Sequence, residues 1–510
     1  MSEAKDTQEQ TKVEIAVENF GPIAEANIDL RPLTVFVGPS NTGKTYFATL
    51  VYALHGAFDG LSDESLFSPF AQHIVTAMAI LSRLLTDLTT PKEEIHEMLN
   101  KLGIIERSFK LSDLPKEIRQ KLNIIVKDTD FFGEELQVEL KNCFDLNSIS
   151  ELMRLTGDQS NEVRVLLRIG ERNHEYWNVR MRASESEVNL DNLTSLNDPT
   201  YDNMVLLPKG WYASGEFLVD DKRVHINGFG SEGNHNRYYL PAARSGIMQS
   251  HRVIAGSLVK RTTRVGLEQF PEIPTLSGVI AEFMQQIILY DEDRSSEFQM
   301  KFFLDEEISE NRVSDLANAL ELDILAGEVR VKPSASGYPD FRYLPQGTNE
   351  EFRLSQTSSM VSELAPLVLY LRSLVQPGDT LIIEEPEAHL HPGAQADMAV
   401  ILARLVRAGV RVIITTHSDW LLQEIGNLIR AGELEKAGQE VSDLPTSLQT
   451  EQVGIWHFQK NGKVEEIPYN RIDGVEPIEY LDVAEDLYNR SARLQNRLEE
   501  MKGDAKRESE

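Results

Sequence analysis

One short segment carries the strongest chemical signal in the sequence. It runs from Gly38 to Thr45 and has the spacing G-x-x-x-x-G-K-[ST] of a phosphate-binding loop. Glycines let the backbone wrap a polyphosphate, and the amide groups of such a loop attract the anion. Lys44 is expected to reach the β- and γ-phosphates, and Thr45 to offer a hydroxyl to Mg²⁺. The candidate nucleotide-binding residues are Gly38, Pro39, Ser40, Asn41, Thr42, Gly43, Lys44 and Thr45.

Two consecutive acids end a hydrophobic run much later in the chain. Glu384 and Glu385 follow the apolar residues 381–383 and precede Pro386. An acid at a strand end can hold Mg²⁺, while its neighbour orients or deprotonates water. Alone, such a pair is usually a solvated strand end. A phosphate-binding loop in the same chain favours Glu384 as a metal ligand and Glu385 as a catalytic residue.

A histidine ends the next apolar run. His417 follows residues 411–416, and an imidazole at such a place can hydrogen-bond a γ-phosphate or the attacking water. A lone histidine at a strand end is more often structural. The expectation that this strand lies beside the acid-bearing strand favours a catalytic role for His417.

The elements that position these residues follow from the hydrophobic pattern. Residues 13–17 and 25–30 alternate between apolar and polar types, and a turn sequence at 19–22 separates them, so they predict a hairpin. Residues 33–37 form a continuous apolar run that predicts a buried strand, and a helix is expected over about 43–57. The candidate loop therefore joins a buried strand to a helix, which is the context it requires.

The second half of the chain predicts a strand, a helix and a strand in that order. The strand ends in the two acids, the helix covers about 393–408, and the second strand covers 411–417. Such a unit builds a parallel sheet. We therefore predict an α/β fold of the P-loop NTPase class, with a helical lobe and an antiparallel β segment inserted.

Composition shifts predict a division into seven parts. These are 1–11, a disordered N-terminus; 12–60, the first part of the head; 61–160, an inserted helical lobe; 161–240, an antiparallel β segment; 241–335, a second helical lobe; 336–425, the second part of the head; and 426–510, a C-terminal extension with a terminal helix. The terminal helix carries an apolar stripe that packs on its own domain or docks a partner helix.

The composition excludes several classes of protein. The chain has 510 residues and a net charge of 51 − 81 = −30, so capture of DNA by its overall charge is disfavoured. Cys143 is its single cysteine, which excludes a disulfide framework and a cysteine zinc site. No signal sequence or membrane-spanning run is present, so we expect a cytoplasmic protein. One window of the sequence is basic, although the chain as a whole is acidic. It is the candidate contact for a nucleic acid or an acidic partner, and the alternative is that its residues pair with the protein's own acids. The window contains Arg244, Arg252, Lys260, Arg261 and Arg264.

The loop, the acids and the histidine, in this order, resemble the ABC-type ATPase heads of the SMC, RecF and OLD-like families. The resemblance covers about 13–60 and 340–425, where residues 384–392 read EEPEAHLHP. It implies ATP and Mg²⁺ as ligands and His417 as the switch histidine. Only about 90 residues follow the last strand, without the acids of a TOPRIM nuclease, so the chain resembles an OLD-like ATPase that lacks this domain.

The resemblance also implies residues that act across a subunit boundary. Ser358 or Ser359, one helix before the acids, would touch the γ-phosphate bound to the other subunit of a homodimer or a higher homo-oligomer. Met360 departs from the family, which usually has glycine there, and this makes close backbone approach to the phosphate less certain. Arg244 would reach the nucleotide or a subunit boundary, and Gln249 would be the Q-loop glutamine.

The implied function is an Mg²⁺-dependent ATPase in which dimerisation of the heads acts as a conformational switch. Its expected setting is defence against phages and mobile elements, together with a separate effector protein. The alternatives are a DNA repair or maintenance ATPase and an ATP-binding scaffold that does not hydrolyse. A GTPase is disfavoured because Asn100-Lys101-Leu102-Gly103 lacks the aspartate of the base-reading motif.

Overall fold

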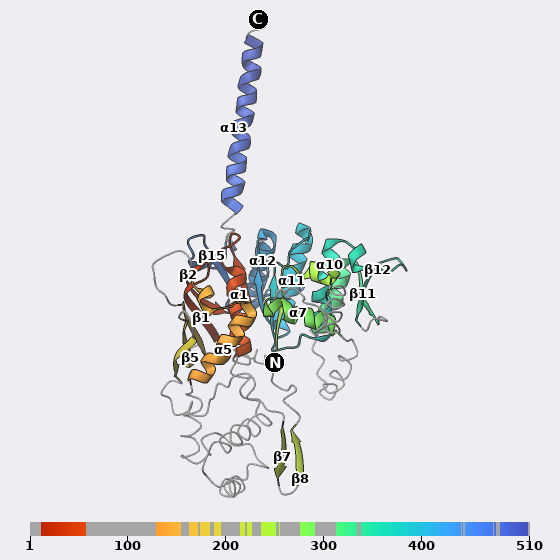
Figure 1. Ribbon diagram of the computed structural model, residues 1–510. Helices are drawn as coiled ribbons and strands as arrows, with labels where there is room; N and C mark the ends of the chain where they lie inside the picture. The colour runs from red at the N-terminus through yellow and green to blue at the C-terminus, as the bar shows by residue number, and fades with distance from the viewer. Residues whose placement is uncertain are drawn as a thin grey trace, which may run out of the picture.

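The computed structural model places an α/β body and one long helix that projects from it (Figure 1). Structure is described for residues 12–57, 129–154, 163–171, 174–183, 188–194, 215–219, 222–226, 236–250, 254, 276–290, 313–333, 338–439, 441, 444–472, 474–475 and 480–507. The predicted lobe at 61–160 lies mostly outside these residues. So do Arg252, Lys260, Arg261 and Arg264 of the basic window.

A six-stranded sheet forms the centre of the body, with the strand order β16-β15-β3-β14-β13-β9. Its parallel strands are β15 (Val453–Phe458), β3 (Leu33–Val37), β14 (Arg411–Thr415), β13 (Thr380–Glu384) and β9 (Arg237–Leu240). The edge strand β16 (Val464–Glu466) runs antiparallel to β15. Every residue of β3, β13 and β14 is buried, as the continuous apolar runs predict for strands covered on both faces.

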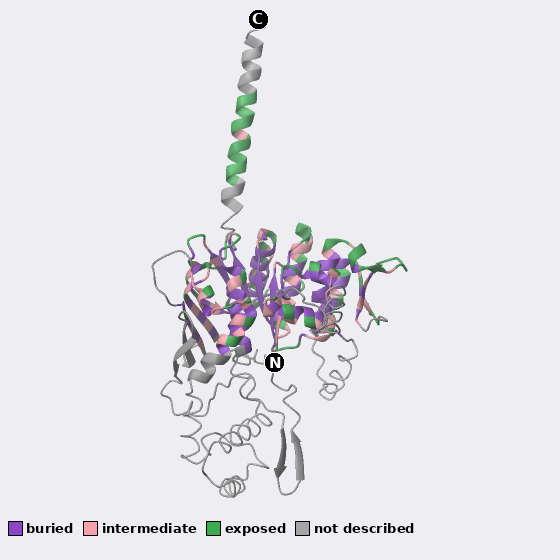
Figure 2. Cartoon of the chain, in the orientation of Figure 1, coloured by how far each residue is buried: buried purple, intermediate pink, exposed green. Residues whose placement is uncertain are grey.

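Alternate residues of the strands pack into two separate cores, one on each face of the sheet. Phe36, Ile382 and Ile413 pack with α1 (Lys44–Ala57) and α5 (Thr129–Phe144). Residues on the opposite face pack with helices that include α10 (Ser359–Ser373), α11 (Pro392–Arg407) and α12 (Asp419–Lys436). Successive side chains of a strand point to opposite faces of the sheet, so each short strand contributes residues to both cores. Figure 2 shows the buried residues concentrated at this sheet.

A second sheet of five antiparallel strands, ordered β2-β1-β4-β5-β6, packs over α1. The hairpin of β1 (Lys12–Phe20) and β2 (Ile23–Leu30) is as predicted. The segment predicted at 161–240 does not stand alone, because β4 (Val163–Glu171) pairs with β1 and continues into β5 (His174–Ala183) and β6 (Val188–Thr194). The remaining strands from this segment are β7 (Gly215–Val219) and β8 (Lys222–Ile226), which form a hairpin. β9 also lies in this segment but belongs to the central sheet.

The residues predicted as a second helical lobe also join the main body. The α7 helix (Gly278–Ile288), the α9 helix (Val313–Ala319) and the π-helical turn η4 (Leu320–Leu325) share one core with α10. A small sheet of β10 (Gly327–Lys332), β11 (Asp340–Pro345) and β12 (Phe352–Arg353) follows them. Short 3₁₀ turns are η3 (Ile149–Leu152), η5 (Leu354–Gln356) and η6 (Thr450–Gln452).

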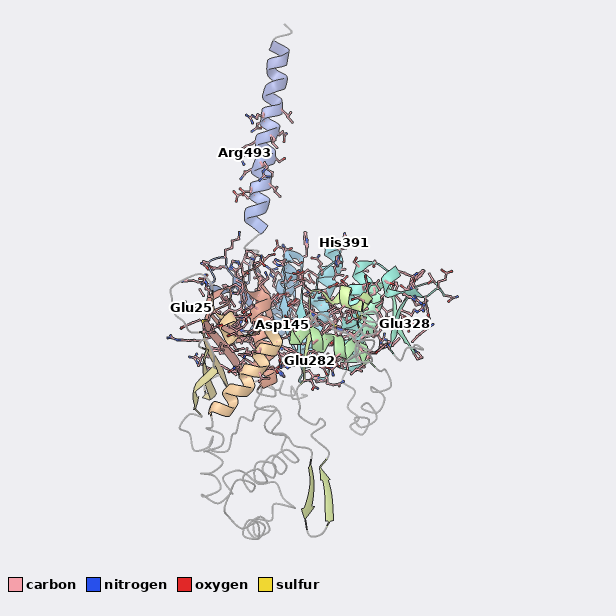
Figure 3. All side chains as sticks on the ribbon, viewed as in Figure 1. Glu25, Asp145, Glu282, Glu328, His391 and Arg493 are labelled. Atoms are coloured by element: carbon pink, nitrogen blue, oxygen red, sulfur yellow. The ribbon has the colours of Figure 1, made fainter. Side chains whose placement is uncertain are left out.

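The C-terminal part divides into a strand of the central sheet and a free-standing helix. β15 lies directly beside β3, so the predicted extension completes the sheet that carries the loop. The last helix, α13 (Tyr480–Arg507), projects from the body, and Figure 3 shows Arg493 on it away from the other elements. Leu487, Leu494 and Leu498 are exposed, so these leucines do not pack on the described part of the same chain. In the described ranges, no helix has the length and apolar character needed to span a bilayer.

Candidate functional site

The phosphate-binding loop lies between β3 and α1, at the carboxyl end of a central strand. Its backbone enters the left-handed region at Gly38, Asn41 and Gly43, with φ of 135°, 63° and 107°. Such turns curve the chain, and the N-terminus of α1 then faces the space inside the curve. The Lys44 ammonium donates hydrogen bonds to the carbonyl oxygens of Gly38, at 2.5 Å, and Pro39, at 2.8 Å. The Lys44 side chain is thus folded back onto the backbone of the loop.

Close packing fixes two glycines of this loop. A Cβ at Gly38 would overlap the carbonyl oxygen of Phe458 in β15. A Cβ at Gly43 would lie 2.7 Å from the Cγ1 atom of Ile23 in the hairpin. Both positions also have a positive φ that favours glycine. The conformation of the loop therefore depends on strands from both ends of the chain.

Hydrogen bonds tie the ends of three neighbouring strands together. The backbone N–H of Thr416, just after β14, donates to the carbonyl oxygen of Phe36 in β3 at 2.9 Å. The backbone N–H of Glu385, just after β13, donates to the carbonyl oxygen of Thr415 at 2.9 Å. The loop after β3, the histidine turn after β14 and the acids after β13 thus meet at one edge of the sheet. Ligands of open α/β sheets bind at this edge, beyond the carboxyl ends of the strands.

The Glu384 carboxylate is buried and held from the side of β9. Its Oε1 atom accepts a hydrogen bond from the Tyr239 hydroxyl, and its Oε2 atom accepts one from the backbone N–H of Ala242 at 2.8 Å. Burial, followed by the charge of Glu384, raises the pKa of Tyr239 well above its ordinary value. The phenol therefore stays protonated and remains a donor. Each carboxylate oxygen keeps a second lone pair that a cation can use.

The Glu385 residue occupies an unusual backbone conformation. Its φ is 44°, in the left-handed region that a residue with a side chain adopts at a cost. Its side chain is half-buried, in contrast to the buried Glu384. Strain of this kind persists only where surrounding contacts enforce it, and it concentrates at functional sites. The turn thus carries two adjacent carboxylates in different environments, one buried and one half-buried.

The His417 residue lies beside the acids, with its backbone anchored by a third acid. The Oε1 atom of Glu387 accepts hydrogen bonds from the Thr416 hydroxyl and the His417 backbone N–H, both at 2.7 Å. Burial raises the pKa of Glu387 from its ordinary value, although these two donors oppose the change. The half-buried His417 then leads into Ser418, whose hydroxyl caps α12 by accepting from Leu421 N–H at 3.0 Å.

The two candidate signature serines lie at the start of α10, on the surface. Ser358 is the N-cap residue, and its hydroxyl accepts a hydrogen bond from the Val361 backbone N–H at 3.4 Å. Ser358 and Ser359 are both exposed. In Figure 1, α11 and α12 are drawn between α10 and α1. The start of α10 thus presents two serine residues at the surface.

The structure differs from expectation at Arg244, and it shows one contact of Gln249. The Arg244 side chain is 1% exposed and points into the body, so it is not part of a basic surface or a subunit boundary. Its guanidinium donates to the backbone carbonyls of Glu384 and Glu385. The amide nitrogen of Gln249 donates to the Ser362 hydroxyl of α10 at 3.3 Å rather than to the loop. The resemblance carried only residue types to these positions, and the packing of α10 determines where their side chains point.

The oxygen donors at this edge of the sheet suit Mg²⁺ that is bound together with a nucleotide. Thr45 and Glu384 offer oxygen atoms, which Mg²⁺ prefers, and Mg²⁺ is usually held by one or two protein oxygens together with substrate phosphates and water. Within the described ranges, His, Cys, Asp and Glu side chains form no group of three that could hold a metal by themselves. The residues fit an ion that arrives with a nucleotide rather than one held in a protein cage.

Sequence reasoning missed three residues that position the site. The sequence patterns do not single out Tyr239 or Glu387, although they identify the partners Glu384 and His417. They also do not indicate Phe458, which lies against Gly38. The sequence signal for Glu387 is its place two residues after Glu385, because an acid that is buried beside a strand end needs hydrogen-bond donors.

Fold and site together define an α/β protein of the P-loop NTPase fold class. Residues 271–422 match the family described as AAA ATPase domain, a range that includes the two acids and His417 but not the phosphate-binding loop. No curated protein matches the chain.

Several solved structures are distantly similar. The SMC head domain from Thermotoga maritima is 10% identical with a TM-score of 0.34, covering 90% of this chain and 99% of that one. The Smc head domain bound to the C-terminal domain of ScpA derived from Pyrococcus furiosus is 10% identical with a TM-score of 0.37, covering 94% and 100%. The recombination mediator protein RecF is 10% identical with a TM-score of 0.31, covering 90% and 99%. The fold assignment rests on the chain's own strand order and loop.

Proposed function

We propose that the chain is an Mg²⁺-dependent ATPase whose two heads close around two ATP molecules. Each phosphate-binding loop would face the serines at the start of α10 in the other subunit. The observation that carries this proposal is the meeting of the loop, the acid pair and His417 at one edge of the sheet. The exposure of Ser358 and Ser359 at the N-terminus of α10 supports an action between subunits.

The roles of the residues follow from their places. Lys44 and the loop amides would hold the phosphates, and Thr45 and Glu384 would hold Mg²⁺, which neutralises phosphate charge when bound. Glu385 is half-buried and would orient or deprotonate the attacking water. His417 would hydrogen-bond the γ-phosphate or that water. Hydrolysis would remove the group that both subunits contact, so the heads would separate and the cycle would act as a switch.

Light scattering on purified Glu385→Gln protein tests this proposal. Without the catalytic carboxylate, ATP should persist and trap the closed pair, so Mg-ATP should raise the mass by one subunit. The matched control is Glu350→Gln, which changes an exposed residue outside helices and strands and should not trap a pair. A triple variant that adds Ser358→Arg and Ser359→Arg to Glu385→Gln should stay at the mass without nucleotide. An unchanged mass of Glu385→Gln protein with Mg-ATP would contradict the sandwich.

For the biological setting we propose defence against phages and mobile elements, with a separate effector. The net charge of −30 supports this over a DNA-repair role, because a repair ATPase must bind a polyanion. Arg244, a member of the basic window, is buried and offers no phosphate contact. Mobility-shift assays at low salt should show no complex with duplex DNA. A salt-sensitive complex at submicromolar protein would favour the repair alternative.

A further inference from the structure

The side chain of Arg244 joins three parts of the body that lie far apart in the sequence. It begins the helical segment 244–250, just after β9. Its Nε atom donates to the carbonyl oxygen of Glu363 in α10 at 3.1 Å, and a terminal nitrogen lies 3.0 Å from the Glu363 carboxylate. That terminal nitrogen, Nη2, also donates to the carbonyl oxygen of Glu385 at 2.9 Å, and Nη1 donates to the carbonyl oxygen of Glu384. The planar fork of an arginine suits such a multiple contact.

The Glu363 end of this link belongs to the helix that presents the signature serines. Glu363 lies in α10, little more than one turn after Ser358 and Ser359, and both members of the ion pair are 1% exposed. A helix moves as a rigid unit over so short a distance. Any displacement of the serines by a ligand is therefore transmitted to Glu363 and to the guanidinium.

The other end of the link belongs to the strained turn at Glu385. Arg244 holds the carbonyl of the residue whose φ is 44°, and it also holds the carbonyl before it. The Glu385 N–H is already fixed by Thr415. The conformation of this turn, and so the direction of the Glu385 carboxylate, depends on the place of the guanidinium.

In the proposed closed pair, these two ends serve different ATP molecules. The serines of α10 contact the nucleotide bound to the other subunit, whereas Glu385 acts on the nucleotide bound to its own chain. We infer that Arg244 is a positioning residue that couples the two ATP sites, because it links engagement of α10 at one site to the alignment of Glu385 at the other. This inference rests on the proposed function, and it predicts that the two sites hydrolyse ATP cooperatively.

Two variants test the coupling in the full-length chain. Arg244→Lys keeps the positive charge that the buried Glu363 needs, but an ammonium cannot contact α10 and both carbonyls in the same fork geometry. Glu363→Gln removes the charge on α10 and leaves the contacts of Arg244 with Glu384 and Glu385 available. The measurements are the ATPase rate against ATP concentration and the dissociation constant of a fluorescent ATP analogue.

The expected changes distinguish a loss of coupling between the two ATP sites from a loss of ATP binding. The unsubstituted protein should show a Hill coefficient clearly above one, as two coupled sites permit. Both variants should lower it to about one and reduce kcat at least about tenfold, while the dissociation constant of the analogue changes less than about twofold. Arg372→Lys is the matched control, since Arg372 forms an ion pair with Glu321 at 2.8 Å from the later part of α10, away from the acids. It should keep the Hill coefficient of the unsubstituted protein.

Failure of the coupling and failure of the proposed function give different results. Retained cooperativity and kcat in both variants would overturn the role of Arg244 while leaving the ATPase intact. Lost analogue binding in Glu363→Gln, with a lowered melting temperature, would show that the pair is only structural and would also overturn it. If the unsubstituted protein binds ATP without hydrolysis or pairing, the proposed function itself fails.

Discussion

The carboxylate of Glu387 lies 2.7 Å from the backbone nitrogen of His417, so the turn after one strand directly holds the turn after the next. The contact involves a single carboxylate oxygen, which also accepts from the Thr416 hydroxyl. A shift of the acid-bearing turn therefore shifts the candidate switch histidine. The backbone of His417 is thus positioned by an acid that lies two residues after Glu385.

Replacing this anchor should weaken both the fold and the reaction. Glu387→Ala leaves the Thr416 hydroxyl and the His417 N–H without their acceptor, and the expected loss is about 1–3 kcal/mol in the free energy of unfolding. Glu387→Gln should cost less, because an amide oxygen can still accept both bonds. Urea denaturation and ATPase rates measure the two effects. Glu350→Ala, at an exposed position outside helices and strands, is the control, and equal stability of Glu387→Ala and Glu350→Ala would contradict the anchoring role.

The lysine of the loop should decide nucleotide affinity. Lys44→Ala removes the charged donor that is now folded over the Gly38 and Pro39 carbonyls, and we expect affinity for an ATP analogue to fall at least about tenfold. Lys463→Ala is the control, because Lys463 is exposed. Fluorescence titration measures both proteins. Unchanged affinity in Lys44→Ala would place the nucleotide elsewhere.

The first glycine of the loop should tolerate no side chain. Gly38→Ala would place a methyl group against the Phe458 carbonyl at a φ of 135°, so either the loop or β15 must move. We expect a loss of about 2 kcal/mol or more in the free energy of unfolding, together with weaker nucleotide binding. Gly347→Ala is the matched control, since Gly347 also has a positive φ, of 77°, but a Cβ there meets nothing within 4 Å. Similar losses in the two variants would show that backbone strain alone, not the contact with β15, is responsible.

A buried acid at the opposite end of the sheet should give stability a specific pH dependence. Asp379 accepts hydrogen bonds from the backbone N–H groups of Asn236 and Gln376, both at 2.7 Å, and burial raises its pKa to about 7 against these bonds. A raised pKa means that the folded chain holds this proton more tightly than the unfolded chain does. The contribution to stability is complete below about pH 4 and is lost as the pH rises through about 7.

The measurement is urea denaturation between about pH 5 and pH 8. Over this range the titration of Asp379 should lower the free energy of unfolding by on the order of 3 kcal/mol. Asp379→Asn cannot titrate and should show a flatter dependence. Glu321, Glu387 and Asp397 also have raised pKa values, and they remain in both proteins, so the difference between the two curves isolates Asp379. Parallel curves would contradict the assignment.

Local sequence patterns predicted the strands and helices better than they predicted which strands pair with each other. The apolar run 33–37 indicated a buried strand, and the run before Glu384 indicated another, since strands covered on both faces need continuous apolar residues. The same patterns do not say which strand pairs with which. The pairing of β15 with β3, and of β4 with β1, brings together residues more than a hundred positions apart, and no local signal encodes it.

The candidate site shows the same division. Lys44, Glu384, Glu385 and His417 stand out because their chemistry depends on residue type and on position at a strand end. The roles of Tyr239, Arg244 and Glu387 depend on which buried groups lack a partner, and this is known only once the elements are packed. An arginine read from the sequence as a surface contact is instead buried between α10 and the acids.

A mixing experiment tests the central claim, composite ATP sites built from two subunits, most directly. Lys44→Ala protein lacks a working loop but keeps its serines, whereas the Ser358→Arg, Ser359→Arg variant keeps its loop. Each should be inactive alone. In a mixed pair, one site combines the intact loop of one chain with the intact serines of the other, so Mg-ATP should raise the mass measured by light scattering in the equal mixture but in neither protein alone. If the mixture keeps the mass of its components, or if the serine variant alone is fully active, the composite site is contradicted.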